Sequence, residues 1–210
     1  MLKRILLTLL VAGSAAYAQT YYVGVLGGYG YAPSLTVTNS TGSADTGLKS
    51  GGVMGALLGG DTSKHWGGEV SYLYRFSDLK LSSGGTEVDF GGRTHVITGD
   101  ILGYFTPKGA SVRPYVSFGG GVRILVGTGT ESASQPLGNY AALTATTETL
   151  AVGDFGLGVK FKLGKSTQMR VEVRDYIGPA PDKVIAPAPG AKMSSMLNDI
   201  TFLVSIAYTW

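Results

Sequence analysis

The last nine residues of the chain, 202–210, constrain its fold more than any other segment. Bulky apolar side chains occupy every second position, and the positions between them are mostly small or polar. The apolar positions are Phe202, Val204, Ile206, Tyr208 and Trp210. Because successive side chains of a β-strand point to opposite sides, this segment predicts a strand with one apolar face. Such a face must meet a protein core or lipid, and a terminal aromatic residue suits a membrane–water interface.

The amino-terminal residues have the pattern of an export signal. Two basic residues precede an apolar run over residues 5–13, and residues 16–18 read Ala-Tyr-Ala. We expect residues 1–18 to be a cleavable signal peptide and residues 19–210 to be the mature domain. The apolar run is shorter than the roughly 20 residues that a membrane-spanning helix needs. Without Lys3 and Arg4 the 17 basic residues fall to 15, against 14 acidic ones, so the charge balance indicates no nucleic-acid partner.

The composition favours closely packed strands over a mixed fold of helices and sheet. The chain has 33 glycines, 12 tyrosines and only 15% charged residues, and its residues 19–210 contain no apolar run long enough for a membrane helix. It has no cysteine, which excludes disulfides and thiolate metal sites. The two histidines, His65 and His95, are far apart in the sequence. We therefore expect neither a metal centre nor a cofactor.

Period-two alternation recurs in eight segments of about the length of a membrane-spanning strand. They are residues 20–31, 50–60, 66–76, 94–105, 114–126, 149–163, 168–177 and 198–210. The connections between them are alternately long and short, as outer loops and periplasmic turns would be. Pro114 opens a strand and every other proline falls in a connection, which fits because proline cannot donate a ladder hydrogen bond. The pattern predicts an all-β, eight-stranded antiparallel up-and-down transmembrane barrel.

The two faces of each predicted strand differ in size and polarity. In residues 66–76 one parity carries Trp66, Tyr72 and Phe76, and the other carries Glu69 and Arg75. Eight strands enclose a space just wide enough for side chains, so the large apolar residues would overfill it. We therefore expect the apolar face to meet lipid and the small and charged residues to fill the lumen. The alternative is a soluble ligand-binding barrel with its apolar face inward.

Aromatic residues fall near both ends of the predicted lipid face. Two such girdles are typical of a transmembrane barrel, in which they lie at the two membrane–water interfaces. We expect outer-membrane lipid and lipopolysaccharide to contact this face. The predicted interface residues are Tyr21, Tyr29, Trp66, Tyr74, Phe105, Phe161, Tyr208 and Trp210.

Charged residues of the inward parity form the main candidate site. Counted from the periplasmic ends of the strands, acidic residues of the third and fourth strands and charged residues of the sixth and seventh lie at similar heights. The hypothesis is a salt-bridge network that plugs the barrel, because unpaired charges in so narrow a space would be costly. The alternative is a narrow small-solute pore lined by the same residues. These residues are Glu69, Asp100, Lys160, Arg170, Glu172 and Arg174.

Nucleophilic catalysis is the other chemistry to weigh. Lipid-modifying barrels place a serine, a histidine and an acid near the outer rim, and His95 is the candidate histidine here, with Glu87, Asp89 and Thr94 nearby. His95 falls on the lipid parity, however, and no serine is spaced two residues from it on the same strand face. We predict no catalytic residue.

The chain resembles the small eight-stranded outer-membrane barrels of the OmpA and OmpX type. The resemblance rests on the closing strand, residues 202–210, and on residues 170–176, which read Arg-Val-Glu-Val-Arg-Asp-Tyr. It implies that the barrel-assembly machinery recognises the carboxyl-terminal strand, although the family usually ends in Phe and this chain ends in Trp210. It covers essentially the whole mature chain as architecture, but only these two stretches as motif. We expect no peptidoglycan-binding module of the kind attached to some relatives.

These patterns favour a non-enzymatic protein of the bacterial outer membrane. Its expected role is structural, in envelope integrity, and adhesion-like, through extracellular partners of its four outer loops. The open alternatives are the narrow pore, the lipid-modifying enzyme and the soluble barrel.

Overall fold

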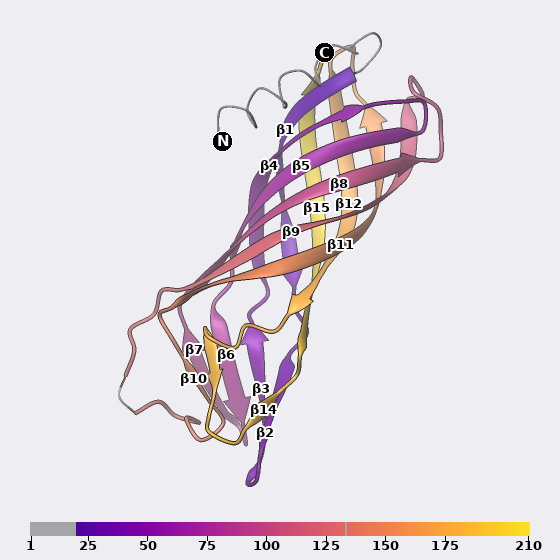
Figure 1. The fold of residues 1–210 in the computed structure, drawn as a ribbon. Helices are drawn as coiled ribbons and strands as arrows, with labels where there is room; N and C mark the ends of the chain where they lie inside the picture. Colours follow the sequence, from indigo (N-terminus) through magenta and orange to yellow (C-terminus); the bar gives the residue numbers. More distant parts are fainter. Residues whose placement is uncertain (1–19, 133) are drawn as a thin grey trace, which may run out of the picture.

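The computed structural model describes residues 20–132 and 134–210, so the expected signal peptide, residues 1–18, lies outside the described part of the chain. Eight long strands form a closed antiparallel barrel (Figure 1). They are β1 (Thr20–Tyr31), β4 (Gly51–Asp61), β5 (Trp66–Phe76), β8 (Gly92–Tyr104), β9 (Val112–Gly127), β11 (Thr147–Lys162), β12 (Thr167–Pro179) and β15 (Met196–Thr209). The predicted fold class, an all-β, eight-stranded up-and-down barrel, is confirmed.

Pairing of the first and last barrel strands closes the sheet. β1 and β15 keep an unbroken antiparallel register along their lengths. Beyond it, the backbone N–H groups of Tyr21 and Trp210 each donate to the other residue's carbonyl oxygen, with N···O distances of 3.1 Å. Hydrocarbon offers no hydrogen-bond partners, so closure satisfies backbone groups that an open edge would leave unpaired. Over the described residues, no helix is long and apolar enough to cross a membrane.

The apolar side chains of the barrel strands point outward. Leu157, Val204 and Ile206 keep 55%, 50% and 54% of their surface exposed, whereas Glu69 and Arg174 on the opposite parity are buried. An apolar belt around a charged interior is the arrangement of a membrane barrel. It excludes the alternative of a soluble barrel with an apolar ligand cavity.

A second layer of structure continues from one end of the barrel. We call it the cap; it comprises the four long connections, residues 32–50, 77–91, 128–132 with 134–146, and 180–195. Its five-stranded sheet has the order β14-β2-β3-β6-β7, and a two-stranded sheet joins β10 to β13. The strands are β2 (Leu35–Asn39), β3 (Gly42–Leu48), β6 (Leu79–Ser83), β7 (Thr86–Phe90), β10 (Ala141–Leu143), β13 (Ile185–Pro187) and β14 (Lys192–Met193).

The cap has a hydrophobic core of its own. Leu48, Leu81 and Leu143 are at most 1% exposed, and Leu125 and Leu197 of the barrel strands belong to the same cluster. Figure 1 shows the cap at the barrel end opposite the carboxyl terminus. The connections at the terminal end are short, as periplasmic turns are, so the cap faces the cell exterior.

The sequence analysis expected long outer loops and missed the strands within them. The signal was present, since Leu35 and Val37 alternate with threonines and Leu79 and Leu81 flank a lysine. Segments of about five residues have little stability alone. Here β2 pairs with β3 and β6 with β7 within one connection, and β3–β6, β14–β2 and β10–β13 join different connections. β14, for example, pairs with β2, placing Lys192 opposite a residue far away in sequence.

The outward position of Val204 allows a direct test of the lipid face. Val204→Arg should lower the free energy of unfolding by about 2–4 kcal/mol, because a charge near the middle of the lipid face is costly. Urea titration of the protein in liposomes measures this loss. The matched control is Thr86→Arg in the cap, which should change stability by less than about 0.5 kcal/mol. Equal losses in the two variants would contradict the lipid-facing assignment.

The cap core allows a second test. Leu81→Ala should destabilise the cap by about 2–5 kcal/mol, because it opens a cavity among buried aliphatic side chains. Protease added outside intact cells should then cleave the cap, while the barrel retains its heat-dependent gel mobility. Thr38→Ala, at an exposed position of β2, should remain resistant. Unchanged resistance of Leu81→Ala would show that the cap does not depend on this core.

Candidate functional site: the charged lumen

The barrel interior holds a balanced set of buried charges. One buried charged residue, Glu148, is set apart from this group, because its carboxylate accepts hydrogen bonds from the cap backbone at Lys183 and Val184. The other buried charged side chains of the described strands are six acidic and six basic residues, all at most 7% exposed. They are Asp61, Glu69, Asp100, Asp154, Glu172 and Asp199, with Arg75, Arg113, Arg123, Lys160, Arg170 and Arg174.

The central level of the lumen joins opposite walls. β5 and β12 lie four places apart in the ring of eight strands, so they face each other across the lumen. Arg170 on β12 donates two hydrogen bonds to the carboxylate of Glu69 on β5, at 2.5 and 3.0 Å. Arg174 donates to Asp100 at 2.5 Å and to Glu172 at 2.7 and 3.0 Å. The structure thus brings together five of the six residues that the sequence singled out.

Lys160, the sixth residue, lies at a different level. Its ammonium Nζ is 3.7 Å from Asp61, donates to the Tyr104 hydroxyl and lies 4.1 Å from the centre of the Tyr22 ring. Arg113 also donates to Asp61 and forms with it and Lys160 a periplasmic level. The sequence analysis placed Lys160 with the central residues because heights counted along strands ignore how strand tilt staggers them. It ended the second predicted strand at residue 60, so Asp61 fell in a turn. It began the fifth predicted strand at residue 114, so Arg113 fell outside it.

A third level lies at the outer end of the lumen. Arg75 of β5 is paired with Asp199 of β15, and its guanidinium also donates to the carbonyl oxygens of Gly30 and Lys49, both at 3.1 Å. Arg123 donates to the carbonyl oxygen of Tyr176 at 2.9 Å. The sequence analysis omitted this level, although inward parity of these charged residues was the available signal.

Lys49 connects the outer level to the cap. Its carbonyl oxygen accepts a hydrogen bond from Arg75 at the outer end of the lumen. Its ammonium group lies 2.5 Å from Asp89 and 3.1 Å from Glu87, both on β7. Hydrogen bonds to Asp89 and then Glu87 raise the pKa of Lys49. The cap and the outer end of the barrel are therefore joined by polar contacts as well as by the shared apolar core.

Tyrosines fill the lumen where glycines leave room. The Tyr22 hydroxyl donates to Glu69 at 3.0 Å, and a Cβ built on Gly59 would lie 2.5 Å from that hydroxyl. A Cβ on Gly158 would likewise lie 2.5 Å from the ring of Tyr115. Glycine is required at both positions because any side chain would displace a buried ring.

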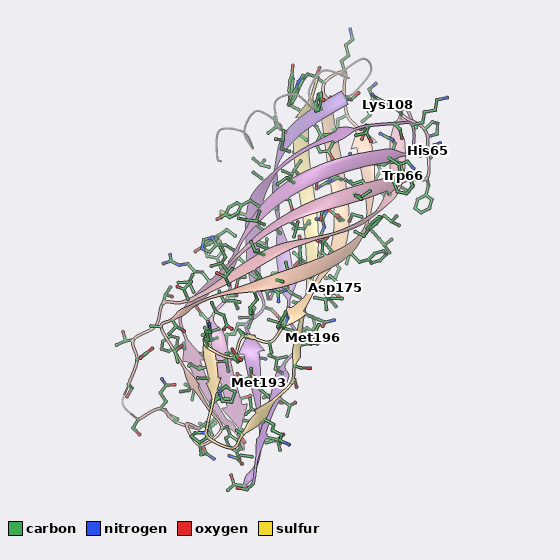
Figure 2. All side chains as sticks on the ribbon, in the orientation of Figure 1. His65, Trp66, Lys108, Asp175, Met193 and Met196 are labelled. Atoms are coloured by element: carbon green, nitrogen blue, oxygen red, sulfur yellow. The ribbon has the colours of Figure 1, made fainter. Side chains whose placement is uncertain are left out.

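The predicted interface aromatics lie on the outer surface at both ends of the barrel. Phe105, Tyr208 and Trp210 are 57–68% exposed, and the Tyr208 and Trp210 rings are stacked 6.2 Å apart. Figure 2 shows Trp66 at the same barrel end as His65 and Lys108, away from the cap. Tyr21, Tyr29 and Trp66 are exposed, and Tyr74 and Phe161 are half-buried. Their contact with the membrane interface stays a prediction.

His95 points outward among aromatic residues. Its Nδ1 lies 2.9 Å from the Tyr72 hydroxyl, and its ring packs edge-on to Tyr74 with centroids 5.2 Å apart. These contacts provide no serine and no carboxylate to build a nucleophilic triad. Among the described residues, no group of three or more histidine, aspartate or glutamate side chains is arranged to hold a metal ion.

Comparison with known proteins identifies the family of this barrel. Residues 5–185 match the family described as the outer membrane protein beta-barrel domain. The chain belongs to this family. It is accordingly a protein of the bacterial outer membrane, as the sequence predicted. No curated protein sequence matches it.

Solved structures share the fold at low sequence identity. Neisserial surface protein A is 9% identical with a TM-score of 0.55, covering 91% of this chain and 99% of its own. The amino-terminal barrel domain of Pseudomonas aeruginosa OprF is 13% identical with a TM-score of 0.47, covering 90% of this chain and 97% of its own. The likeness to Neisserial surface protein A concerns the fold alone.

The pair of Glu69 and Arg170 permits a double-mutant cycle. Glu69→Gln or Arg170→Gln alone should lower the free energy of unfolding by about 3–5 kcal/mol, because each leaves an uncompensated buried charge. The double variant should recover most of that loss, since neither charge remains. Urea unfolding in liposomes measures all three, with Asp182→Asn in the cap as the control. Additive losses would contradict a direct pairing.

Proposed function

We propose that this protein is a non-enzymatic, non-conducting barrel that strengthens the outer membrane and presents its cap as an interaction surface. The observation that carries the proposal is the direct contact of Arg170 with Glu69 across the centre of the lumen. A guanidinium held by two hydrogen bonds to the carboxylate on the opposite wall occupies the space that a permeating solute would need.

The packing around this contact supports a closed lumen. Arg174 lies beside it and contacts Asp100 and Glu172, while Tyr22 and Tyr115 fill the space above neighbouring glycines. Eight strands leave little room beyond that occupied by side chains. The same residues therefore serve a plug better than a small-solute pore.

The cap supports the interaction role. Its fourteen-residue core cluster is built around a sheet, so the outer surface is a defined shape rather than a set of separate loops. Its charges are mixed. Asp45 lies on β3, Lys80 on β6 and Glu87 and Asp89 on β7, and Lys49 just after β3 contacts the last two. A mixed, polar surface favours a protein partner that is bound by shape and hydrogen bonds over a polyanion.

Two further partners belong to this proposal. The outward apolar belt suits the acyl chains of outer-membrane lipid and lipopolysaccharide. The closing strand β15, with Phe202, Ile206 and Tyr208 on one face, suits recognition by the barrel-assembly machinery. An enzymatic role receives no comparable support, because His95 contacts tyrosines on the lipid-facing side.

Single-channel recording tests the closed lumen. The purified protein in a planar bilayer should show no large, steady conductance, because the central ion pairs exclude water and ions. Replacing Arg174 and Glu172 together by alanine should raise ion leakage by removing two large side chains while keeping the charges balanced. Ala substitution of two exposed cap residues of opposite charge, Lys192 and Asp182, is the control. Steady large conductance from the unaltered protein would overturn the plug and favour the pore.

A further inference from the structure

The periplasmic end of the barrel contains a pocket of about 380 Å³. Its wall is formed by two short turns, with Lys108 from the turn after β8 and Lys165 from the turn after β11, and by Lys162 at the end of β11. Figure 2 shows Lys108 at this end, near His65 and Trp66. The pocket is thus the mouth of the lumen on the side away from the cap.

The floor of this pocket is the periplasmic level of the charge network. Arg113 and Lys160 are 6% and 3% exposed, and both are directed to the same carboxylate, that of Asp61. At the floor, one acidic side chain faces two buried cations. The wall adds three lysines to these two cations. Among the side chains that line the pocket, positive charge is in large excess.

We propose that this mouth is a binding site for a phosphate-bearing anion. A phosphate group carries one negative charge as a diester and up to two as a monoester, and its free oxygens accept hydrogen bonds from several lysine ammonium groups at once. The hydroxyls of Ser166 and Thr167, which also line the pocket, add neutral donors. The partly desolvated floor strengthens the attraction, because the effective dielectric there is lower than in bulk water.

The rest of the lumen determines how such a ligand reaches the site. The central and outer levels and the cap separate this mouth from the cell exterior. The anion therefore enters from, and returns to, the periplasmic side. Two sources have the required chemistry: the headgroup of an anionic phospholipid in the inner leaflet, near the rim residues Phe161 and Trp210, or a soluble phosphate monoester.

Trp210 provides a direct reporter, because it lines the pocket and the chain has only two tryptophans. In a Trp66→Phe background, the mature chain in phosphatidylcholine nanodiscs is titrated with glycerol 3-phosphate and with inorganic phosphate at constant ionic strength. We expect a saturable change in Trp210 fluorescence. Lys162→Gln with Lys165→Gln should weaken the affinity by on the order of tenfold, because two charged donors are lost.

Lys64→Gln is the matched control, because Lys64 lies in a periplasmic turn but does not line the pocket. It should change the affinity by less than about twofold, as expected for a screened surface charge. Heat-dependent gel mobility establishes that each variant is folded. The proposal is overturned if neither ligand gives a saturable signal, or if Lys64→Gln weakens binding as much as the double variant does, which would indicate diffuse surface charge only.

Nanodiscs that contain phosphatidylglycerol distinguish the two sources. If the lipid headgroup occupies the mouth, the apparent affinity for soluble glycerol 3-phosphate should fall in these discs, and the double lysine variant should abolish that competition. If the soluble ester is the ligand, its affinity should be the same in both kinds of disc. Both results support an anion site at the mouth and differ in its natural occupant.

Discussion

The structure depends on charge neutrality in a space too narrow for bulk water. Apart from Glu148, which contacts the cap backbone, the described strands bury twelve charged side chains, six of each sign. Removing one ion from water costs several kcal/mol after relaxation, and this cost is offset only when partners and hydrogen bonds are well placed. Arg170 meets this requirement by crossing the lumen to Glu69, and Arg174 does so by contacting Asp100 and Glu172. The centre of the lumen is therefore occupied by interlocking ion pairs.

The other features of the fold keep these pairs in place. Closure of β1 on β15 removes the sheet edge, and the glycines opposite Tyr22 and Tyr115 let large rings enter a small lumen. At the outer end, Arg75 donates hydrogen bonds to backbone carbonyl oxygens of β1 and of the segment before β4. These bonds connect the outer end of the barrel to the cap. The cap adds its own apolar core, so the extracellular end is covered by a folded layer.

The two ends of the lumen consequently differ. The outer end is covered, and its arginines Arg75 and Arg123 contact Asp199 and backbone carbonyl oxygens of other strands. The periplasmic end remains a pocket with excess positive charge among its lining side chains. This asymmetry separates two surfaces, one facing the environment through the cap and one facing the periplasm through Lys108, Lys162 and Lys165.

The sequence by itself determined the eight barrel strands and the two faces of each, because side-chain alternation lies within a single segment, and the narrow lumen of eight strands assigned the charged face to the inside. Residues 66–76 are an example, since Trp66 lies on the exposed face of the strand and Glu69 on the buried face. The sequence identified the central charges and Lys160, but not the cap strands or the other charges at the two ends of the lumen. The tertiary structure decided which charges meet. Strand tilt places Lys160 beside Asp61 rather than Glu69, and only the folded chain brings Lys192 of β14 opposite β2 to complete the cap. Pairing heights and contacts between distant segments depend on the stagger of the whole barrel, which no single segment encodes.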